Sequence, residues 1–309
     1  MNNLNLELAP SITKTASKQT YYTIRLLADR ERVADAYRAY AYFRWLDDAL
    51  DTESGLSSER GVFIQRQMSL MESCYRGEFV QDVTIEEQML IELIQSDTEK
   101  NSGLQSYLRN MMAVMAFDAV RRGRLISQSE LNEYSRLLAN AVTEAMHHFI
   151  GHCCYSPQNE ARYLAVTAAH ITHMLRDTFD DIQAGYFNIP REVLDANRIA
   201  PQDVGSDGYR AWVQNRVQLA RTYFKLGREY LSEVENPRCR LAGLAYTARF
   251  ECVLDLIEQD GYVLRAAYPE RKGLGAIIRA GGSIFPSLFI HHEPSAVLGP
   301  TPVRQRSLR

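Results

Sequence analysis

Residues 40–51 read YAYFRWLDDALD. Apolar and aromatic residues recur there every three or four positions, a spacing that predicts an amphipathic helix. Because residues four apart lie one above the other on a helix, Asp47 and Asp51 present their carboxylates on one face. The preceding residues of this face change from apolar to aromatic to charged: Val33, Tyr37, Tyr40 and Arg44. We therefore expect the two carboxylates to point inward.

A second acidic stretch, residues 176–181, repeats this spacing with Asp177 and Asp181. The upstream residues of its face again run from apolar to polar: Val166, His170 and His173. A single such pair is most often a solvated surface feature. Two inward pairs would repel each other, so cations must neutralise them. Carboxylate oxygens suit Mg²⁺, whose coordination is commonly completed by water and substrate phosphates, and together the pairs predict a magnesium diphosphate site.

Helical periodicity extends over most of the chain, whereas strand alternation is almost absent. Turn residues fall between the periodic stretches. The predicted helices cover residues 29–50, 86–95, 107–122, 130–149, 159–183, 209–234 and 241–267. We expect a single all-α domain over residues 16–292, with a flexible N-terminus (1–15) and a flexible C-terminal tail (293–309).

The composition is that of an ordinary globular protein. The chain has 309 residues, of which 46% are hydrophobic and 24% charged, and a net charge of -3. These values argue against disorder and against a role in coating nucleic acid. The five cysteines are an odd number at irregular spacings, and we expect no signal segment, so a reducing cytoplasm is the simplest compartment. No apolar run predicts a spanning helix, and a peripheral membrane contact stays open.

In these motifs the chain resembles the squalene/phytoene synthase family, the head-to-head branch of isoprenyl diphosphate chemistry. The segments that carry the resemblance are 17–21 (SKQTY), 40–51 and 175–181 (LRDTFDD). Weaker matches are 134–144, with the preceding Asp118, and 248–262. The resemblance implies an all-α isoprenoid synthase fold of the class I terpenoid synthase type. Its two acidic helices would face each other across the mouth of a central cavity.

The resemblance also implies roles for individual residues. The metal-binding carboxylates of the family match Asp47, Asp51, Asp177 and Asp181, with Asp48 as an additional ligand. Positions that hold diphosphate in the family match Tyr40, Arg44, Arg176 and, by its place in the chain, Arg265. The implied cofactor is Mg²⁺, as two or three ions with Mn²⁺ as a substitute. The implied substrate is an allylic prenyl diphosphate.

Several positions depart from the family pattern. His173 replaces a metal-binding Asn of the family, and imidazole binds Mg²⁺ less readily than an oxygen ligand does. His173 is therefore a candidate metal ligand, and the binding of a third metal ion is left open. Other polar or aromatic replacements are expected near the cavity: His170 for Gln, Asn140 and Thr143 for two glycines, and Phe250 for Tyr. Residues 185–190 (GYFNIP) lack the Arg and Tyr of the family's loop, which argues against an NADPH requirement.

These polar side chains make a second prenyl tail less favourable in the cavity. We therefore expect a prenyltransferase that keeps the family's donor chemistry but prenylates a small aromatic acceptor, as relatives that act on a carbazole do. The ring attacks the allylic cation, and a base then removes the ring proton. The candidate bases are His170, His173 and the departing diphosphate.

Two alternatives stay open. One is an ordinary squalene or phytoene synthase that condenses two prenyl diphosphates, and the other is a non-catalytic relative that serves in assembly. The presence of all four main aspartates argues against the second. The donor chain length and the oligomeric state are left open by the sequence. Outside the acidic motifs, Arg121, Arg122 and Arg124 are typical of a solvated helix end.

Overall fold

The computed structural model describes residues 3–52 and 57–269, and these residues form helices and no strand. The result confirms the predicted all-α class. In chain order the helices are α1 (Asn3–Ala16), α2 (Lys18–Leu27), the short 3₁₀ helix η1 (Arg30–Arg32), α3 (Val33–Thr52), α4 (Ser57–Tyr75), α5 (Ile85–Ser96), α6 (Gly103–Arg121), α7 (Gln128–Phe149), α8 (Ala161–Arg176), α9 (Thr178–Ala184), α10 (Arg191–Asn197), α11 (Asp207–Glu233) and α12 (Pro237–Gln259).

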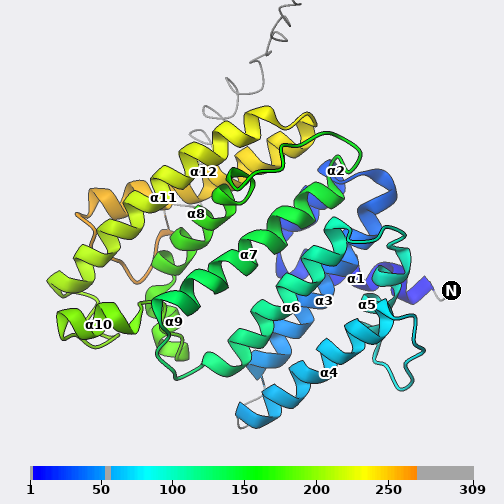
Figure 1. Cartoon of the computed structure of the whole chain (residues 1–309), viewed down its shortest axis with the longest axis horizontal. Coiled ribbons are helices and arrows are strands. Elements are labelled where there is room, and N and C mark those ends of the chain that lie inside the picture. The colour runs from blue at the N-terminus through cyan, green and yellow to red at the C-terminus, as the bar shows by residue number, and fades with distance from the viewer. Residues whose placement is uncertain (1–2, 53–56, 270–309) are drawn as a thin grey trace, which may run out of the picture.

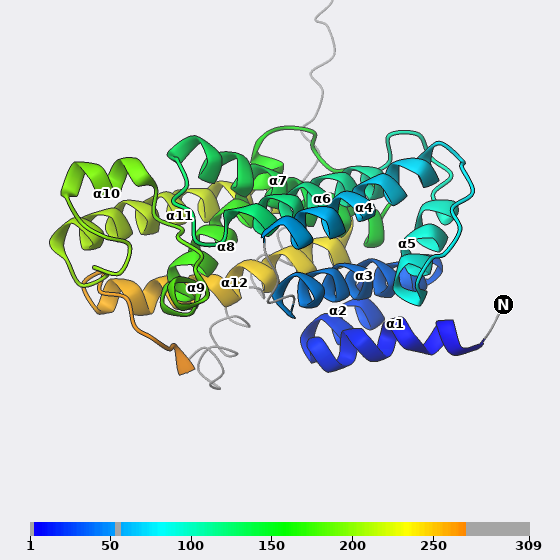
Figure 2. The same ribbon diagram turned by 90° about the horizontal axis from the view of Figure 1, so that it is seen from below.

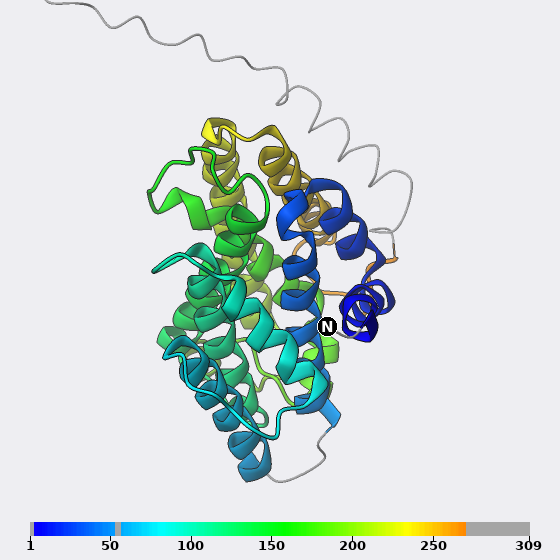
Figure 3. The ribbon, with the colours of Figure 1, turned by 90° about the vertical axis from the view of Figure 1, so that its right-hand side faces the viewer.

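The helices lie in layers around α8. Figure 1 shows α8 between α7 and α11, and α8 packs against both of them and against α12. Seen from below in Figure 2, α6, α7 and α11 lie on one side and α3 and α12 on the other. The N-terminal helices α1 and α2 lie outside α3, as Figure 3 also shows, and α1 packs against α3. This arrangement places α8 at the centre of the bundle.

Local sequence signals fix where several of these helices begin. Thr84 and Ser127 each form a capping box with a glutamate three residues later, and Asn236 caps α12 ahead of Pro237. Such caps satisfy backbone N–H groups that have no partner within the helix. The central helix α8 is fixed by close packing. A Cβ at Gly227 of α11 would lie 2.7 Å from Ala165, so only glycine permits this approach.

Two predicted helices end earlier than their periodicity suggested. The predicted helix over 159–183 breaks at Asp177, where α8 ends and α9 begins. There the Thr178 hydroxyl donates to the carbonyls of Met174 and Leu175, which competes with the helical backbone pattern. The predicted helix over 241–267 ends at Gln259, because Gly261 and Tyr262 adopt positive φ angles.

The N-terminal segment differs from the expectation of flexibility. Residues 3–16 form α1, and Ala9 and Thr13 are buried against the bundle. The predicted tail over 293–309 lies outside the described residues. Within the described residues no helix has the length and apolar character needed to cross a membrane.

Candidate active site

An apolar cavity of about 430 Å³ runs between the central helices. Side chains from α2, α3, α6, α7, α8, α11 and α12 line it. Its aromatic lining comes from Tyr40, Tyr107, Phe149, Tyr230 and Tyr246. Thr143 also lines it, and the buried hydroxyl of Thr143 has no hydrogen-bond partner among the described residues. The aspartates of the two acidic motifs are not part of this lining.

The first acidic motif lies at the end of α3, beyond Tyr40. The side chain of Asp47 is 45% exposed and Asp51 is also exposed, so the prediction that this pair points inward is wrong. Arg44 binds Asp47 at 3.1 Å and also pairs with Asp48. Partial burial raises the pKa of Asp47 to about 6, and the nearby carboxylates of Asp51 and Asp118 add to the shift against the pull of Arg44.

The second acidic motif lies at the junction of α8 and α9. Asp177 pairs with His173 at 2.7 Å and with Arg176 at 2.5 Å. Burial opposes ionisation here, but the hydrogen bonds from Arg176 and His173 hold the pKa of Asp177 below its usual range. Burial raises the pKa of Asp181 to about 6, and the charge of Asp177 adds to the shift. Each motif therefore has one aspartate whose carboxyl group ionises less readily than usual, mainly because of burial.

A buried polar network connects the two motifs. Arg121 at the end of α6 binds Asp118 at 2.6 Å and donates to Asn188 at 2.8 Å. Asn188 in turn donates to Asp181 at 2.7 Å. The charge of Asp118 also acts on Asp47, and that of Asp51 acts on Asp118. Through this network the predicted acidic pairs are brought to one region of the molecule, the mouth of the site.

Arg121 is thus a residue of the candidate site that its sequence context misidentified. The prediction of a solvated helix end is wrong for Arg121, whose side chain is 7% exposed. Its guanidinium lies over the rings of Tyr134 and Tyr186, at 4.7 and 4.9 Å from their centroids. The partners Tyr134, Tyr186 and Asn188 lie far along the chain, and only the weak match around Asp118 pointed to this group.

The remaining predicted site residues do not all lie together. His170 is buried against the Tyr134 ring, 5.1 Å between centroids, and burial lowers the pKa of His170 to about 3. Phe250 packs behind Tyr246, and its ring lies 6.4 Å from that of His173. Arg265 pairs with Asp260. Asn140 does not line the cavity with Thr143; it lies in a second groove between α7, α8 and α11.

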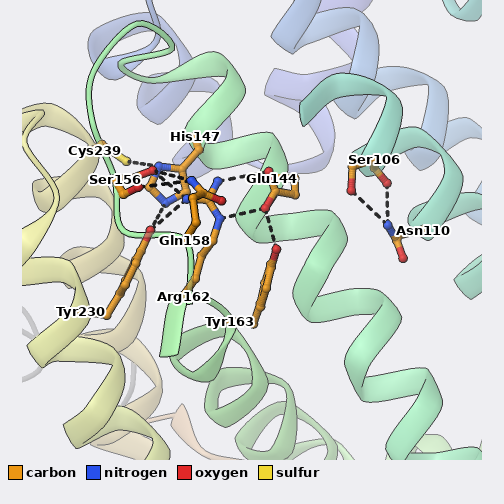
Figure 4. A network of polar contacts seen from close by, with 10 residues as sticks. All are labelled: Ser106, Asn110, Glu144, His147, Ser156, Gln158, Arg162, Tyr163, Tyr230 and Cys239. Atoms are coloured by element: carbon orange, nitrogen blue, oxygen red, sulfur yellow. Dashed lines mark hydrogen bonds and ion pairs between the residues drawn. The ribbon is translucent and has the colours of Figure 1, made fainter. Parts of the chain in front are cut away.

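A second polar network, which we call the floor, contributes to the cavity lining: Glu144, His147, Ser156, Arg162, Tyr163, Tyr230 and Cys239 (Figure 4). Arg162 binds Glu144 through two nitrogens, at 2.8 and 3.1 Å, and donates to Tyr230 at 3.0 Å. Tyr230 also bonds His147 at 2.9 Å. Arg162 and Tyr230 both line the cavity. The floor therefore adds polar groups that bind one another to a mainly apolar lining.

The mouth has the donor chemistry for magnesium. Within the described ranges, no three His, Cys, Asp or Glu side chains are gathered closely enough to hold a metal by themselves. Mg²⁺ is commonly held by one or two carboxylates together with substrate phosphates and water, so each aspartate pair can supply its share. Burial is the main cause of the raised pKa values of Asp47 and Asp181, and neighbouring carboxylates add to both shifts, so a cation bound here would favour the ionised carboxylates.

Sequence comparisons place this arrangement among known proteins. A family model described as squalene/phytoene synthase matches residues 13–272. The chain is 24% identical to the phytoene synthase of Thermus thermophilus over 261 residues, which cover 80% of this chain and 81% of that protein. It is 23% identical to the chloroplastic phytoene synthase 3 of Zea mays over 278 residues, which cover 85% of this chain and 62% of the maize protein. The chain thus spans less than two thirds of the maize protein's length.

Solved structures show the same fold. A squalene synthase, HpnC from Alicyclobacillus acidocaldarius, has a TM-score of 0.65 at 20% identity and covers 84% of this chain and 95% of its own. A dehydrosqualene synthase solved with a ligand has a TM-score of 0.68 at 15% identity and covers 92% and 95%. These likenesses confirm the predicted class I terpenoid synthase fold.

Proposed function

This chain belongs to the squalene/phytoene synthase family, a family of prenyltransferases, and from that premise we propose that it ionises an allylic prenyl diphosphate and transfers the prenyl group to a carbon nucleophile. The bond that breaks joins C1 of the prenyl chain to the diphosphate oxygen. The bond that forms joins C1 to a carbon of the acceptor. The acceptor loses a proton, and diphosphate leaves.

The residues of the mouth support the ionisation step. Asp47, Asp51, Asp177 and Asp181 would hold Mg²⁺, with Asp48 and His173 beside them. Bound Mg²⁺ supplies the positive charge that stabilises the departing diphosphate. Arg44 and Arg176 each pair with an aspartate of one acidic motif, and each could turn from that aspartate to the diphosphate. Tyr40 lines the cavity one helical turn before Arg44 and would orient the diphosphate end of the donor.

The cavity lining is suited to the allylic carbocation that ionisation produces. Its lining is mainly apolar and aromatic, so it excludes water and shields an allylic carbocation until the acceptor attacks. Aromatic faces such as those of Tyr107 and Tyr246 attract positive charge.

The volume of the cavity supports a small acceptor over a second prenyl chain. At about 430 Å³ it lies near the low end of the roughly 300–1,000 Å³ typical of pockets for a single small molecule. Where Arg162 and Tyr230 line the cavity, the wall is polar and less favourable for a long prenyl tail. One prenyl chain with a compact aromatic acceptor fits this space better than two prenyl chains do. Head-to-head condensation remains the second candidate, because the similar proteins are phytoene and squalene synthases.

The geometry distinguishes among the candidate bases. With a pKa lowered to about 3 by burial, His170 is a weak proton acceptor. His173 is half-exposed and bound to Asp177. We assign deprotonation to the departing diphosphate, with His173 as the protein group placed beside it.

Incubation of the enzyme with Mg²⁺ and one prenyl diphosphate at a time tests the proposal. Dimethylallyl, geranyl, farnesyl and geranylgeranyl diphosphate are each supplied with and without carbazole and with and without NADPH, and products are identified by mass spectrometry. We expect prenylated carbazole, no dimeric hydrocarbon and no effect of NADPH. A presqualene-type or phytoene-type product would establish the head-to-head alternative instead.

The non-catalytic alternative is tested by a double variant. Changing Asp47 and Asp177 to Asn should abolish diphosphate release from every donor while the protein stays folded. If the wild type also releases no diphosphate from any donor, the assembly role is favoured over the transferase.

A further inference from the structure

A second groove lies on the outer side of α8, away from the apolar cavity. It has a volume of about 420 Å³ and is lined by α7, α8 and α11. Polar groups and apolar groups share its surface. The polar groups include Ser135 and Asn140 of α7 and Arg216 and Tyr223 of α11, and the apolar ones include Ile171 and Leu219. The groove is thus built differently from the cavity, and the proposed transferase reaction does not use it.

Arg216 is the unusual residue of this groove. Its guanidinium makes no hydrogen bond or ion pair with any residue in the described part of the chain. Burial lowers the pKa of Arg216, and the nearby hydroxyl of Tyr223 opposes this shift. By contrast, Arg121, Arg162 and Arg176 are each bound to a carboxylate. A partly buried cation without a counter-ion is costly, so the groove is electrostatically incomplete.

Two further groups in the groove can donate hydrogen bonds. The Ser135 hydroxyl is buried and has no partner among the described residues. The Asn140 side chain lines the same groove, one helical turn further along α7. Buried polar groups in native proteins are nearly always hydrogen-bonded, so an unpaired Ser135 next to an unpaired arginine points to a missing acceptor.

The charges at the rim do not supply that acceptor. Arg136 is exposed and bound to Glu133 at 2.7 Å. Glu160, at the start of α8, is exposed to solvent and forms no side-chain cap on its helix. The groove therefore carries a net positive charge at its buried end.

We propose that this groove binds a small organic anion, whose carboxylate or phosphate group pairs with the Arg216 guanidinium and whose apolar part lies against Ile171 and Leu219. The planar guanidinium matches both kinds of anion through two parallel hydrogen bonds. Ser135 and Asn140 would donate to the remaining anion oxygens. The site is separate from the diphosphate mouth, because none of its lining residues belongs to the acidic motifs.

Calorimetric titration without Mg²⁺ tests the site, with benzoate as the carboxylate probe and phenyl phosphate as the phosphate probe. At least one probe should bind the wild type and raise its Tm. Arg216→Gln should weaken that binding by about tenfold or more, since it removes a charge-assisted contact. Arg136→Gln, which removes an exposed arginine from the rim of the same groove, should leave the affinity within about twofold. The tighter probe identifies the class of anion.

Two additional measurements keep the result unambiguous. Adding Mg²⁺ and inorganic diphosphate should leave probe binding unchanged, because those ligands occupy the mouth. If Arg216→Gln does not fold, the Ser135→Ala/Asn140→Ala variant should weaken the probe instead. The proposal is overturned if neither probe binds at millimolar concentration, if diphosphate displaces the probe, or if Arg136→Gln weakens binding as much as Arg216→Gln.

Discussion

The mouth and the floor are both polar, yet they differ in how their charges are balanced. At the floor, Glu144 and Arg162 bind each other through two contacts, and Tyr163, Tyr230 and Ser156 complete their hydrogen bonds. At the mouth, Asp47 and Asp181 have raised pKa values because neighbouring carboxylates add to the effect of burial. A balanced network stabilises the fold, whereas an unbalanced one is ready for a ligand of opposite charge.

The largest expected effect is a loss of activity when a carboxylate is removed from the mouth. Asp177→Asn should lower kcat/KM for diphosphate release by about 10³-fold, because it removes a carboxylate that would hold Mg²⁺ beside the leaving group. Steady-state assays of released diphosphate measure it. The exposed neighbour Asp180 provides the control, and Asp180→Asn should change kcat/KM by less than about twofold. Equal losses in the two variants would mean that Asp177 has no special role.

The next largest effect is a loss of folding stability when the ion pair of the floor is broken. Glu144→Ala leaves the buried Arg162 without its carboxylate, which should lower the free energy of unfolding by about 3 kcal/mol. Urea unfolding measures the change. Glu133 lies on the same helix in an exposed pair with Arg136, so Glu133→Ala should cost less than about 0.5 kcal/mol. A Glu144→Ala protein as stable as the wild type would contradict a structural role for the floor.

A smaller effect concerns the pH response of the floor. Burial lowers the pKa of His147 to about 4 from its ordinary value of 6.5, and Arg162 adds to the shift. Between those values the unfolded chain binds more protons than the folded protein. Stability is therefore full above pH 6.5 and is lost as the pH falls toward 4. From pH 7 to pH 5 the loss attributable to His147 should be about 1–2 kcal/mol.

Comparison of urea unfolding at pH 7 and pH 5 checks this response. His147→Gln keeps a polar side chain but cannot titrate, so its loss between the two pH values should be smaller than that of the wild type. An unchanged pH dependence in this variant would place the acid sensitivity elsewhere.

The smallest effect concerns the cavity wall. Thr143→Val has nearly the same shape and removes a buried hydroxyl without a described partner, so it should raise stability by up to about 1 kcal/mol. Thermal unfolding measures this. If Thr143 contacts a polar acceptor, the same variant should also shift products toward dimeric hydrocarbon. A destabilised variant would show that the hydroxyl is satisfied in solution.

Much of the fold was predictable from local pattern. Periodicity identified the central helices because each has one buried face, as in α7 and α11. The helix break at Asp177 could not be read the same way, because it depends on hydrogen bonds of Thr178 and on ion pairs with Arg176 and His173. Helix α1 was taken for a flexible end, because its packing against α3 is a long-range contact.

The site was predictable where its residues share a helix and not where they meet from different helices. The two aspartate pairs follow a regular spacing, so they could be named from the sequence. Arg121 and Asn188 meet only through the fold, and neither carries a motif of its own. Asn140 and Thr143 are three residues apart on α7, yet they line different pockets, because α8 packs between those two faces.

The central helix α8 also sets the spacing between the floor and the second acidic motif. It carries Arg162 near its first residue, and Asp177 directly follows its last. With a rise of about 1.5 Å per residue, these two positions lie about 22 Å apart along the helix axis. The length of one helix thus determines how far the second acidic motif lies from the floor, and the tight approach of Gly227 to Ala165 holds that helix in place. Adding or removing one helical turn in α8 would change this separation by about 5.4 Å.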